Sequence, residues 1–258
     1  MGVVNVTPDS FSDGGRYLDP GAAVAQARAL VEEGADIVDV GAESSRPGAR
    51  GISADEELSR LAPVLEGLGD FQVPVSVDTA KPEVMRAALA AGAAMINDIA
   101  ALRAPGALAA VAPSGAAICL MHMQGEPRTM QKEPSYRDVV AEVAAFLEER
   151  VAAAEQAGIA RERIVVDPGF GFGKTVAHNF ELLRNLERIA ALGLPVLAGW
   201  SRKSTLGAIT GRSADDRLAA SLAAALLAVE RGARIVRVHD VAATRDALKV
   251  LAALEDKP

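Results

Sequence analysis

Cysteine, histidine and aromatic residues are scarce in this sequence, and the scarcity of cysteine and histidine argues against disulfides and zinc sites. The 258 residues include one cysteine, three histidines and one tryptophan, and aromatic side chains make up 3% of the chain. A single cysteine cannot form an intramolecular disulfide, which fits a reducing compartment. Cys119 lies in the apolar run 116–121, so we interpret it as a buried strand residue. Because the chain has no His-x-His pair, no HExxH motif and no cysteine cluster, we expect no zinc site.

Long hydrophobic runs and an excess of positive charge are also missing. The longest apolar run, residues 222–229, is far shorter than the roughly 20 residues of a membrane-spanning helix. The first residues do not have the basic region and apolar stretch of a signal peptide. The net charge is −7 and no Lys/Arg cluster offsets it, which argues against nonspecific nucleic-acid binding. We therefore expect a soluble cytoplasmic protein without a membrane or nucleic-acid partner.

The sequence does contain a regular alternation of short apolar runs and longer Ala- and Leu-rich stretches. Strands are predicted over residues 2–6, 36–40, 74–77, 94–96, 116–121, 164–166, 195–198 and 235–238. Helices are predicted over residues 21–33, 54–68, 82–91, 106–112, 136–157, 177–191, 215–231 and 242–254. Such alternation predicts parallel strands joined by right-handed crossovers. Repeats of this kind fill a chain of the length typical of a (β/α)₈ barrel, so we predict a single α/β domain over residues 1–258, a TIM barrel. An open doubly wound sheet is the alternative.

Polar residues end the apolar runs, and in a barrel the carboxyl ends of the strands share the rim at which catalysis occurs. The residues at or just past these ends are Asn5, Asp39, Asp78, Asn97, His122, Asp167, Ser201 and His239. Taken singly, each of Asp78, Asn97 and Asp167 fits equally well as the N-cap of the next helix. Taken together, Asp78, Asn97 and Asp167 instead suggest a ring of hydrogen-bond acceptors for a heterocycle with several N–H groups.

Cations gather at the same predicted rim of an acidic protein. Arg46 follows the second predicted strand, Lys203 the seventh, and Arg237 and His239 belong to the eighth. Spacing by two residues places Arg237 and His239 on one face of a strand. The loops after strands 7 and 8 are a frequent phosphate site in barrels of this kind. We therefore expect an anionic substrate, a phosphate or a pyrophosphate.

The Gly- and Phe-rich segment 167–175 suggests a nucleotide-binding loop, but its spacing excludes one. A P-loop that ends in Gly173-Lys174-Thr175 requires glycine at position 168, where the chain has Pro168. The alternating Gly and Phe residues fit a loop that presents an aromatic wall to a flat ligand. His178 falls in a predicted helix, and we interpret it as a surface residue.

Read in order, several segments of the chain together resemble one enzyme family. They are NVTPDSFSDGG, GAESSRPGA, VDT, IND, MHMQGEPRTMQ, DPGFGFGK, GWSRKS and RVHD. Over essentially the whole chain they closely resemble the dihydropteroate synthases. That family joins 6-hydroxymethyl-7,8-dihydropterin diphosphate to p-aminobenzoate with Mg²⁺, and releases pyrophosphate and 7,8-dihydropteroate. Methyltetrahydrofolate-binding corrinoid methyltransferases share the barrel and are the alternative, but the first loop and SRKS distinguish the synthase.

The resemblance implies a role for each matching residue. It implies that the pterin is bound by Asp78, Asn97, Met121, Asp167 and Lys203. It implies that the diphosphate is bound by Asn5, Arg46, Arg237 and His239, with Asn5 also at the metal. It implies that p-aminobenzoate, whose pocket sulfonamide drugs occupy in this family, contacts Ser45, Pro47, Phe172 and Ser204. The expected catalytic residues are Asp167, Lys203, Arg237 and His239. Family members are commonly dimers, so a homodimer is expected.

The chain departs from the family pattern in two places. Gly41-Ala42-Glu43-Ser44-Ser45 stands where relatives usually have Gly-Gly-Glu-Ser-Thr. Because Ser45 keeps the hydroxyl and loses a methyl group, we expect a slightly looser aminobenzoate pocket. The short segment that usually precedes the first strand is also absent from the printed sequence. A start codon set too late, a shortened chain and a less covered lower end of the barrel all remain open.

Overall fold

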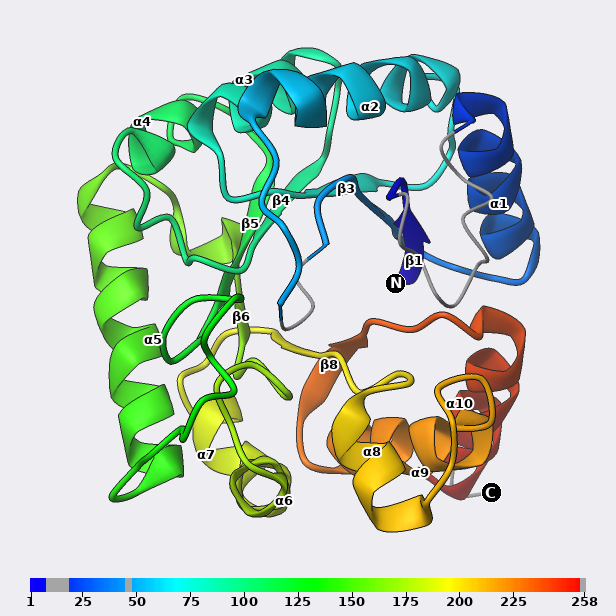
Figure 1. Cartoon of the computed structure of the whole chain (residues 1–258), viewed down its shortest axis with the longest axis vertical. Coiled ribbons are helices and arrows are strands. Elements are labelled where there is room, and N and C mark those ends of the chain that lie inside the picture. The colour runs from blue at the N-terminus through cyan, green and yellow to red at the C-terminus, as the bar shows by residue number, and fades with distance from the viewer. Residues whose placement is uncertain (8–18, 45–47, 256–258) are drawn as a thin grey trace.

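Eight parallel strands follow one another around a single sheet in the order of the chain (Figure 1). The computed structural model describes residues 1–7, 19–44 and 48–255. The strands are β1 (Gly2–Asn5), β2 (Val38–Gly41), β3 (Val75–Asp78), β4 (Met95–Asp98), β5 (Ala117–Met121), β6 (Ile164–Asp167), β7 (Val196–Ala198) and β8 (Ala233–Val236).

The two ends of the sheet meet and close the barrel. The N–H of Val3 donates to the carbonyl of Val238 at 3.1 Å, and the N–H of Val238 donates to the carbonyl of Met1 at 2.9 Å. Gly2 and Val238 form a parallel bridge. Because an open sheet has two unpaired edges, this closure excludes the doubly wound alternative and confirms the predicted (β/α)₈ fold.

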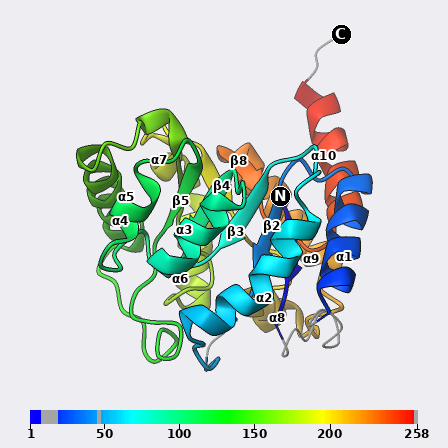
Figure 2. The same ribbon diagram turned by 90° about the horizontal axis from the view of Figure 1, so that it is seen from above.

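Helices surround the strands, and Figure 2 shows the end of α10 standing out from the ring. They are α1 (Pro20–Glu32), α2 (Ala54–Gly67), α3 (Pro82–Ala90), α4 (Ala107–Val111), α5 (Val139–Gln156), α6 (Val176–Arg184), α7 (Leu186–Ala190), α8 (Ser204–Thr210), α9 (Leu218–Glu230) and α10 (Val241–Glu255). Several N-termini are capped by side chains that accept hydrogen bonds from backbone N–H groups, as Asp19 does for α1 and Ser53 for α2.

The observed helices differ from the predicted ones in two places. The single helix predicted over residues 177–191 is divided into α6 and α7 at Asn185, whose amide donates to the carbonyl of Glu181 at 2.9 Å. The backbone N–H of Asn185 donates to the same carbonyl at 3.1 Å, and the helix ends there because Asn185 leaves the helical conformation, with φ −111° and ψ 25°. Helix α8 was not predicted, because it begins at Ser204 within a segment that we interpreted as a loop.

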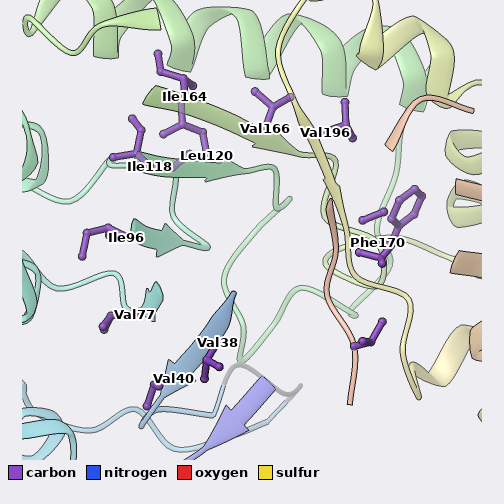
Figure 3. Close-up of a cluster of buried hydrophobic side chains, with 14 of the residues drawn as sticks. Val38, Val40, Val77, Ile96, Ile118, Leu120, Ile164, Val166, Phe170 and Val196 are labelled. Atoms are coloured by element: carbon purple, nitrogen blue, oxygen red, sulfur yellow. The ribbon is translucent and has the colours of Figure 1, made fainter. Parts of the chain in front are cut away.

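Alternation along the strands separates two apolar layers. The large cluster between strands and helices contains the side chains labelled in Figure 3, among them Val38, Ile96 and Leu120. A smaller cluster contains Cys119 and Val165, one position along from members of the large cluster. Since successive side chains of a strand point to opposite faces, the smaller cluster fills the inside of the barrel. The buried position of Cys119, with no exposed surface, confirms its predicted place in a strand.

Candidate functional site

A cavity of about 490 Å³ opens at the carboxyl ends of the strands, where the sequence predicted the chemistry. The predicted site residues that line it are Asn5, Asp78, Phe172, Lys203, Ser204, Arg237 and His239. Asn97, Met121 and Asp167 do not line this cavity; each ends or nearly ends a strand and is almost completely buried. The predicted residues Ser45, Arg46 and Pro47 lie outside the described residues.

The same alternation that fills the barrel directs these side chains inward. Asp78, Asn97, Met121 and Asp167 stand at the carboxyl ends of β3, β4, β5 and β6. Asn97 and Met121 are two positions after Met95 and Cys119, which belong to the inner cluster. A spacing of two keeps a side chain on the same face of the strand. These four side chains therefore extend the inner layer of the barrel from the apolar cluster toward the rim.

Arg237 joins two carboxylates at the base of the cavity. Its Nε lies 2.6 Å from Oδ2 of Asp39, and its Nη2 lies 3.0 Å from Oδ2 of Asp78. Asn97 donates from Nδ2 to Oδ2 of Asp39 at 3.3 Å. Burial raises the pKa of Asp78 to about 7, against the opposing effect of Arg237. Burial opposes charge on Arg237, but Asp39 and Asp78 outweigh it and raise the pKa of the guanidinium.

Asp39 is a component of the site to which sequence reasoning gave no role. Its side chain has no exposed surface, and its Oδ1 has no hydrogen-bond partner among the described residues. A buried carboxylate without a counter-charge is costly, so Arg237 stabilises Asp39 as much as Asp39 orients Arg237. Its only sequence signal was its position at the end of an apolar run, because its pairing with a residue 198 positions away is a tertiary contact.

Lys203, Asp167 and Phe172 lie around one edge of the site. The ammonium of Lys203 donates to the carbonyl of Phe170, and its Nζ lies 4.7 Å from the centre of the Phe172 ring, a cation–π contact. Burial lowers the pKa of Lys203 to about 8, and the nearby carboxylate of Asp167 opposes this shift. Burial also raises the pKa of Asp167, which Lys203 counteracts.

His239 and Arg237 both line the cavity, although β8 ends before them at Val236. The bridge of Val238 to Gly2 keeps the chain extended past the end of the strand, so alternation still directs both side chains to one side. Ser201 fixes His239: its Oγ accepts from the His239 N–H at 3.2 Å and lies 2.9 Å from Nδ1 of the ring.

Glu43 is a further acidic residue of the cavity wall, and its charge is compensated from outside the cavity. Its two oxygens accept from the N–H of Ile52 at 3.0 Å and from Lys81 at 2.5 Å. Lys81 also donates at 2.5 Å to Glu57, which is completely buried. These contacts raise the pKa of Lys81 despite its burial. Glu43 and Ile52, which flank residues 44–51, are thereby connected to Lys81, which lies between β3 and α3.

His178 has a local role that differs from catalysis. It is half-buried near the start of α6 and forms a capping box with Thr175, in which each residue's side chain bonds to the backbone N–H of the other. Its ring also meets the edge of Tyr136 at 4.9 Å between centroids. The residue therefore stabilises a helix start away from the cavity lining.

In the part of the chain that the structure describes, no three or more His, Cys, Asp or Glu side chains group as a metal-binding cluster. The described helices also include none with the length and apolar character to cross a membrane. The cavity at the carboxyl ends of the strands is lined by carboxylates and cations, among them Asp78, Lys203 and Arg237.

Comparisons with known proteins agree with this class of site. The family model described as Pterin binding enzyme matches residues 1–239, so the barrel is that of a pterin-binding enzyme. The dihydropteroate synthase of Escherichia coli (strain K12) is 51% identical over 254 residues, covering 98% of this chain and 90% of that protein. The dihydropteroate synthase of Neisseria meningitidis serogroup B is 53% identical, covering 98% and 92%.

Solved structures give the same result. Xanthomonas albilineans dihydropteroate synthase with 4-aminobenzoic acid has a TM-score of 0.94 at 56% identity, covering 100% of this chain and 93% of that one. The enzyme of Yersinia pestis in a sulfonamide complex has a TM-score of 0.96 at 44% identity, covering 99% and 93%. This chain belongs to the dihydropteroate synthase family, whose members are transferases.

Proposed function

We propose that the cavity binds 6-hydroxymethyl-7,8-dihydropterin diphosphate and p-aminobenzoate and joins them into 7,8-dihydropteroate. The observation that carries this proposal is the convergence of Asp78, Lys203, Arg237 and His239 on one cavity, because a pterin needs acceptors and a diphosphate needs cations. A solved relative at 51% identity, the Xanthomonas albilineans enzyme in complex with 7,8-dihydropteroate, supports the product.

The acidic ring is assigned to the pterin. Asp78, Asn97 and Asp167 supply acceptors for its N–H groups, Met121 packs near the ring, and Lys203 donates to it. Burial raises the pKa of Asp167 and lowers that of Lys203, and the charge of each residue opposes the shift of the other, which supports their placement on one side of the pterin. A carboxylate close to the pterin also offsets positive charge that develops on the ring as the diphosphate leaves.

The cations are assigned to the leaving group. Arg237 and His239 hold the diphosphate, with Asn5 from β1 beside them and Arg46 as a further predicted contact outside the described residues. Hydrogen bonds from cations to the diphosphate oxygens strengthen as the C–O bond breaks and negative charge moves onto the leaving group. His239 is held by Ser201 for this task.

Phe172 and Ser204 are assigned to p-aminobenzoate, with Ser45 and Pro47 as predicted contacts outside the described residues. Both described residues line the cavity, and Phe172 offers a flat ring face next to Lys203. Aromatic rings prefer offset-stacked or edge-to-face contacts, which suits the benzoate ring.

The reaction needs positioning and charge stabilisation more than a base. The bond between the pterin methylene carbon and the diphosphate oxygen breaks, the aniline nitrogen forms a bond to that carbon, and the nitrogen then loses a proton to solvent. The attacking nitrogen is neutral at pH 7, so no strong base is required. Asp167, Lys203, Arg237 and His239 stabilise the charges that develop on the pterin and on the diphosphate. Exclusion of water from the cavity prevents water from attacking the methylene carbon, which would give the alcohol in place of dihydropteroate.

The residues present fit a magnesium ion that arrives with the diphosphate. Mg²⁺ keeps several waters and is often held by one or two protein oxygens together with substrate phosphates. The amide oxygen of Asn5 offers one such ligand in the cavity wall, without a cluster of carboxylates around it among the described residues. When bound, the ion neutralises charge on the leaving diphosphate. Removal of Mg²⁺ with EDTA should abolish turnover, and added Mg²⁺ should restore it.

Two further parts of the proposal concern assembly and location. A homodimer is supported by exposed apolar side chains on α8 and α9: Ile209, Leu218 and Leu227. Light scattering should give twice the mass of one chain, and Ile209→Glu should give the monomer if this face is the interface.

A cytoplasmic location is supported by the buried, unpaired thiol of Cys119.

The function is tested by mixing the protein with both substrates and Mg²⁺ and measuring pyrophosphate and dihydropteroate together. Wild-type protein should release one pyrophosphate per dihydropteroate, and Asp167→Asn should lower turnover strongly. Near-full turnover in the variant would remove Asp167 from the mechanism. Absence of pyrophosphate release from folded wild-type protein would overturn the proposed function.

A further inference from the structure

The turn that follows β6 is held by side chains at every carbonyl from residue 169 to residue 173. Lys203 donates to the carbonyl of Phe170, Gln131 to that of Gly171 at 2.5 Å, and Tyr136 to that of Gly173 at 2.7 Å. The remaining two carbonyls, those of Gly169 and Phe172, both bond to Lys174. Main-chain carbonyls of a surface loop usually bond to water or backbone, so this turn is positioned by its donors.

Lys174 is the buried centre of this arrangement. Only 3% of the residue is exposed. Its Nζ lies 2.9 Å from the carbonyl of Gly169, 3.0 Å from that of Phe172 and 2.9 Å from Nδ1 of His122. None of the ion pairs among the described residues includes it. Burial of an amino group costs free energy unless its N–H groups are hydrogen-bonded, so these three partners stabilise Lys174 in its buried position.

The turn has no room to shift on its other side. Gly169 has a φ of +69°, and a Cβ there would lie 1.9 Å from the carbonyl oxygen of His122. Gly173 has a φ of +59°, and a Cβ there would lie 2.3 Å from the carbonyl oxygen of Gln124. Because the two glycines lack a Cβ, the turn packs directly against the backbone of residues 122–124, while Lys174 bonds to two of its carbonyls.

The turn carries groups that the proposed reaction needs. The ring of Phe172 lines the cavity and faces Lys203. The N–H of Gly169 donates to Oδ1 of Asp167 at 2.7 Å. A change in the direction of the Gly169 and Phe172 carbonyls would thus move the ring of Phe172 directly. It would also move Asp167, through the hydrogen bond from the N–H of Gly169.

We propose that Lys174, supported by His122, is a positioning residue that sets Phe172 for p-aminobenzoate by binding the Gly169 and Phe172 carbonyls. The inference rests on the proposed function. It gives a role to the lysine of the Gly173-Lys174-Thr175 segment, whose spacing is not that of a P-loop. Burial lowers the pKa of His122 to about 3, and Lys174 adds to this shift, so the imidazole is neutral at physiological pH.

The test compares Lys174→Ala, Lys174→Met and the exposed control Lys249→Met on α10. Both Lys174 variants should raise KM for p-aminobenzoate by roughly tenfold, with a smaller change in KM for the pterin diphosphate and in kcat. n-Propylamine replaces the atoms lost in Lys174→Ala and should lower KM again in that variant only. Lys174→Met fills the volume without an N–H donor and should not respond.

Trp200 gives a readout that does not depend on activity. It is the only tryptophan, and its ring centroid lies 4.5 Å from that of Phe170 in the same turn. Its emission should shift in Lys174→Met and stay unchanged in Lys249→Met. If the wild-type protein releases no pyrophosphate, the proposed function fails, while this emission still shows whether Lys174 holds the turn.

A second pair of variants decides the question if the Lys174 variants do not fold. His122→Asn keeps an acceptor near the position of Nδ1, and His122→Leu removes it. The leucine variant should raise KM for p-aminobenzoate, and the asparagine variant should remain near wild type. A wild-type KM in folded Lys174→Met, or equal KM values in the two His122 variants, would overturn the proposal.

Discussion

The guanidinium of Arg237 donates to the carboxylate of Asp78 at 3.0 Å, although 159 positions separate the two residues along the chain. Asp78 ends β3, and Arg237 follows β8. The cation assigned to the diphosphate and the carboxylate assigned to the pterin are therefore direct neighbours. In 6-hydroxymethyl-7,8-dihydropterin diphosphate the pterin ring and the diphosphate are joined through one methylene group, so groups that bind the two parts must also lie in one cavity, as these do.

Replacement of Asp78 should weaken recognition of the pterin. In Asp78→Asn the acceptor for the heterocycle becomes a weaker one, and Arg237 loses one of its two carboxylates. We expect kcat/KM for the pterin diphosphate to fall by roughly 30-fold, ~2 kcal/mol, the size of a hydrogen bond to a charged group. Steady-state kinetics measure this, with the exposed Asp70→Asn as control. Equal kinetics in the two variants would contradict the assignment of Asp78.

Asp78 should also make stability depend on pH. Its pKa is raised from 3.8 to about 7, so between these values the folded protein holds a proton that the unfolded chain has lost. This contribution to stability is fully present below pH 3.8 and is lost as pH rises through about 7. The slope cannot exceed ~1.4 kcal/mol per pH unit for one proton.

Urea titrations at several pH values between 4 and 8 measure this dependence. The free energy of unfolding of the wild type should decrease with pH relative to that of Asp78→Asn. Asp98, whose pKa burial raises to about 6, contributes in the same direction and remains in the variant. Parallel curves for wild type and variant would show that Asp78 does not take up this proton.

Lys203 should give activity an alkaline limit. Burial lowers its pKa to about 8, so its positive charge is lost as pH rises through that value. We expect kcat/KM for the anionic pterin diphosphate to decline above about pH 8. Lys203→Arg keeps its charge at higher pH, so its activity should be lower throughout but flat over this range. A decline at the same pH in the arginine variant would assign the titration to another group.

Two glycines with similar backbone angles should respond differently to alanine. Gly169 and Gly158 both have positive φ, +69° and +88°, but only Gly169 has a backbone atom where a Cβ would lie. Gly158→Ala should cost ~1–2 kcal/mol for the left-handed conformation alone. Gly169→Ala should cost several kcal/mol more, ~4 in total, because the backbone at His122 must also move.

Thermal and urea unfolding of both variants measure the difference. Activity provides a second comparison, since the shifted turn carries Phe172 into a new position while Gly158 lies at the end of α5, away from the cavity lining. Equal losses of stability in the two variants would mean that the turn tolerates displacement from residues 122–124.

Strand positions could be predicted because parallel strands covered by helices are continuously apolar. The predicted and observed ends differ by a few residues at most, as for β3, predicted over 74–77 and found at Val75–Asp78. The polar residues of the rim followed from these ends, because all strands of a closed parallel barrel end at one rim, whereas Met121 and Ser204 entered the site only through the family resemblance. The roles assigned to individual residues, including those of Ser45, Arg46 and Pro47, remain predictions.

Other features could not be predicted because they depend on partners distant in sequence. The buried carboxylate of Asp39 is stabilised by its ion pair with Arg237, and the buried amino group of Lys174 by its hydrogen bond with His122. Nothing in the local pattern around Lys174 distinguishes a buried lysine from a solvated one. The break between α6 and α7 is instead a local feature, in which the side-chain amide of Asn185 donates to both the carbonyl and the carboxylate of Glu181.

The number of strands, their direction and the end of the barrel that carries the polar residues follow from the order of amino acids alone, because periodicity and apolar runs are properties of neighbouring residues. Which charges pair and which backbone groups are fixed depends on how the folded chain brings distant residues together. Closure of the barrel brings Asp39, Asp78 and Arg237 within hydrogen-bonding distance, and the energy of such contacts depends on distance and burial, which a linear pattern does not contain.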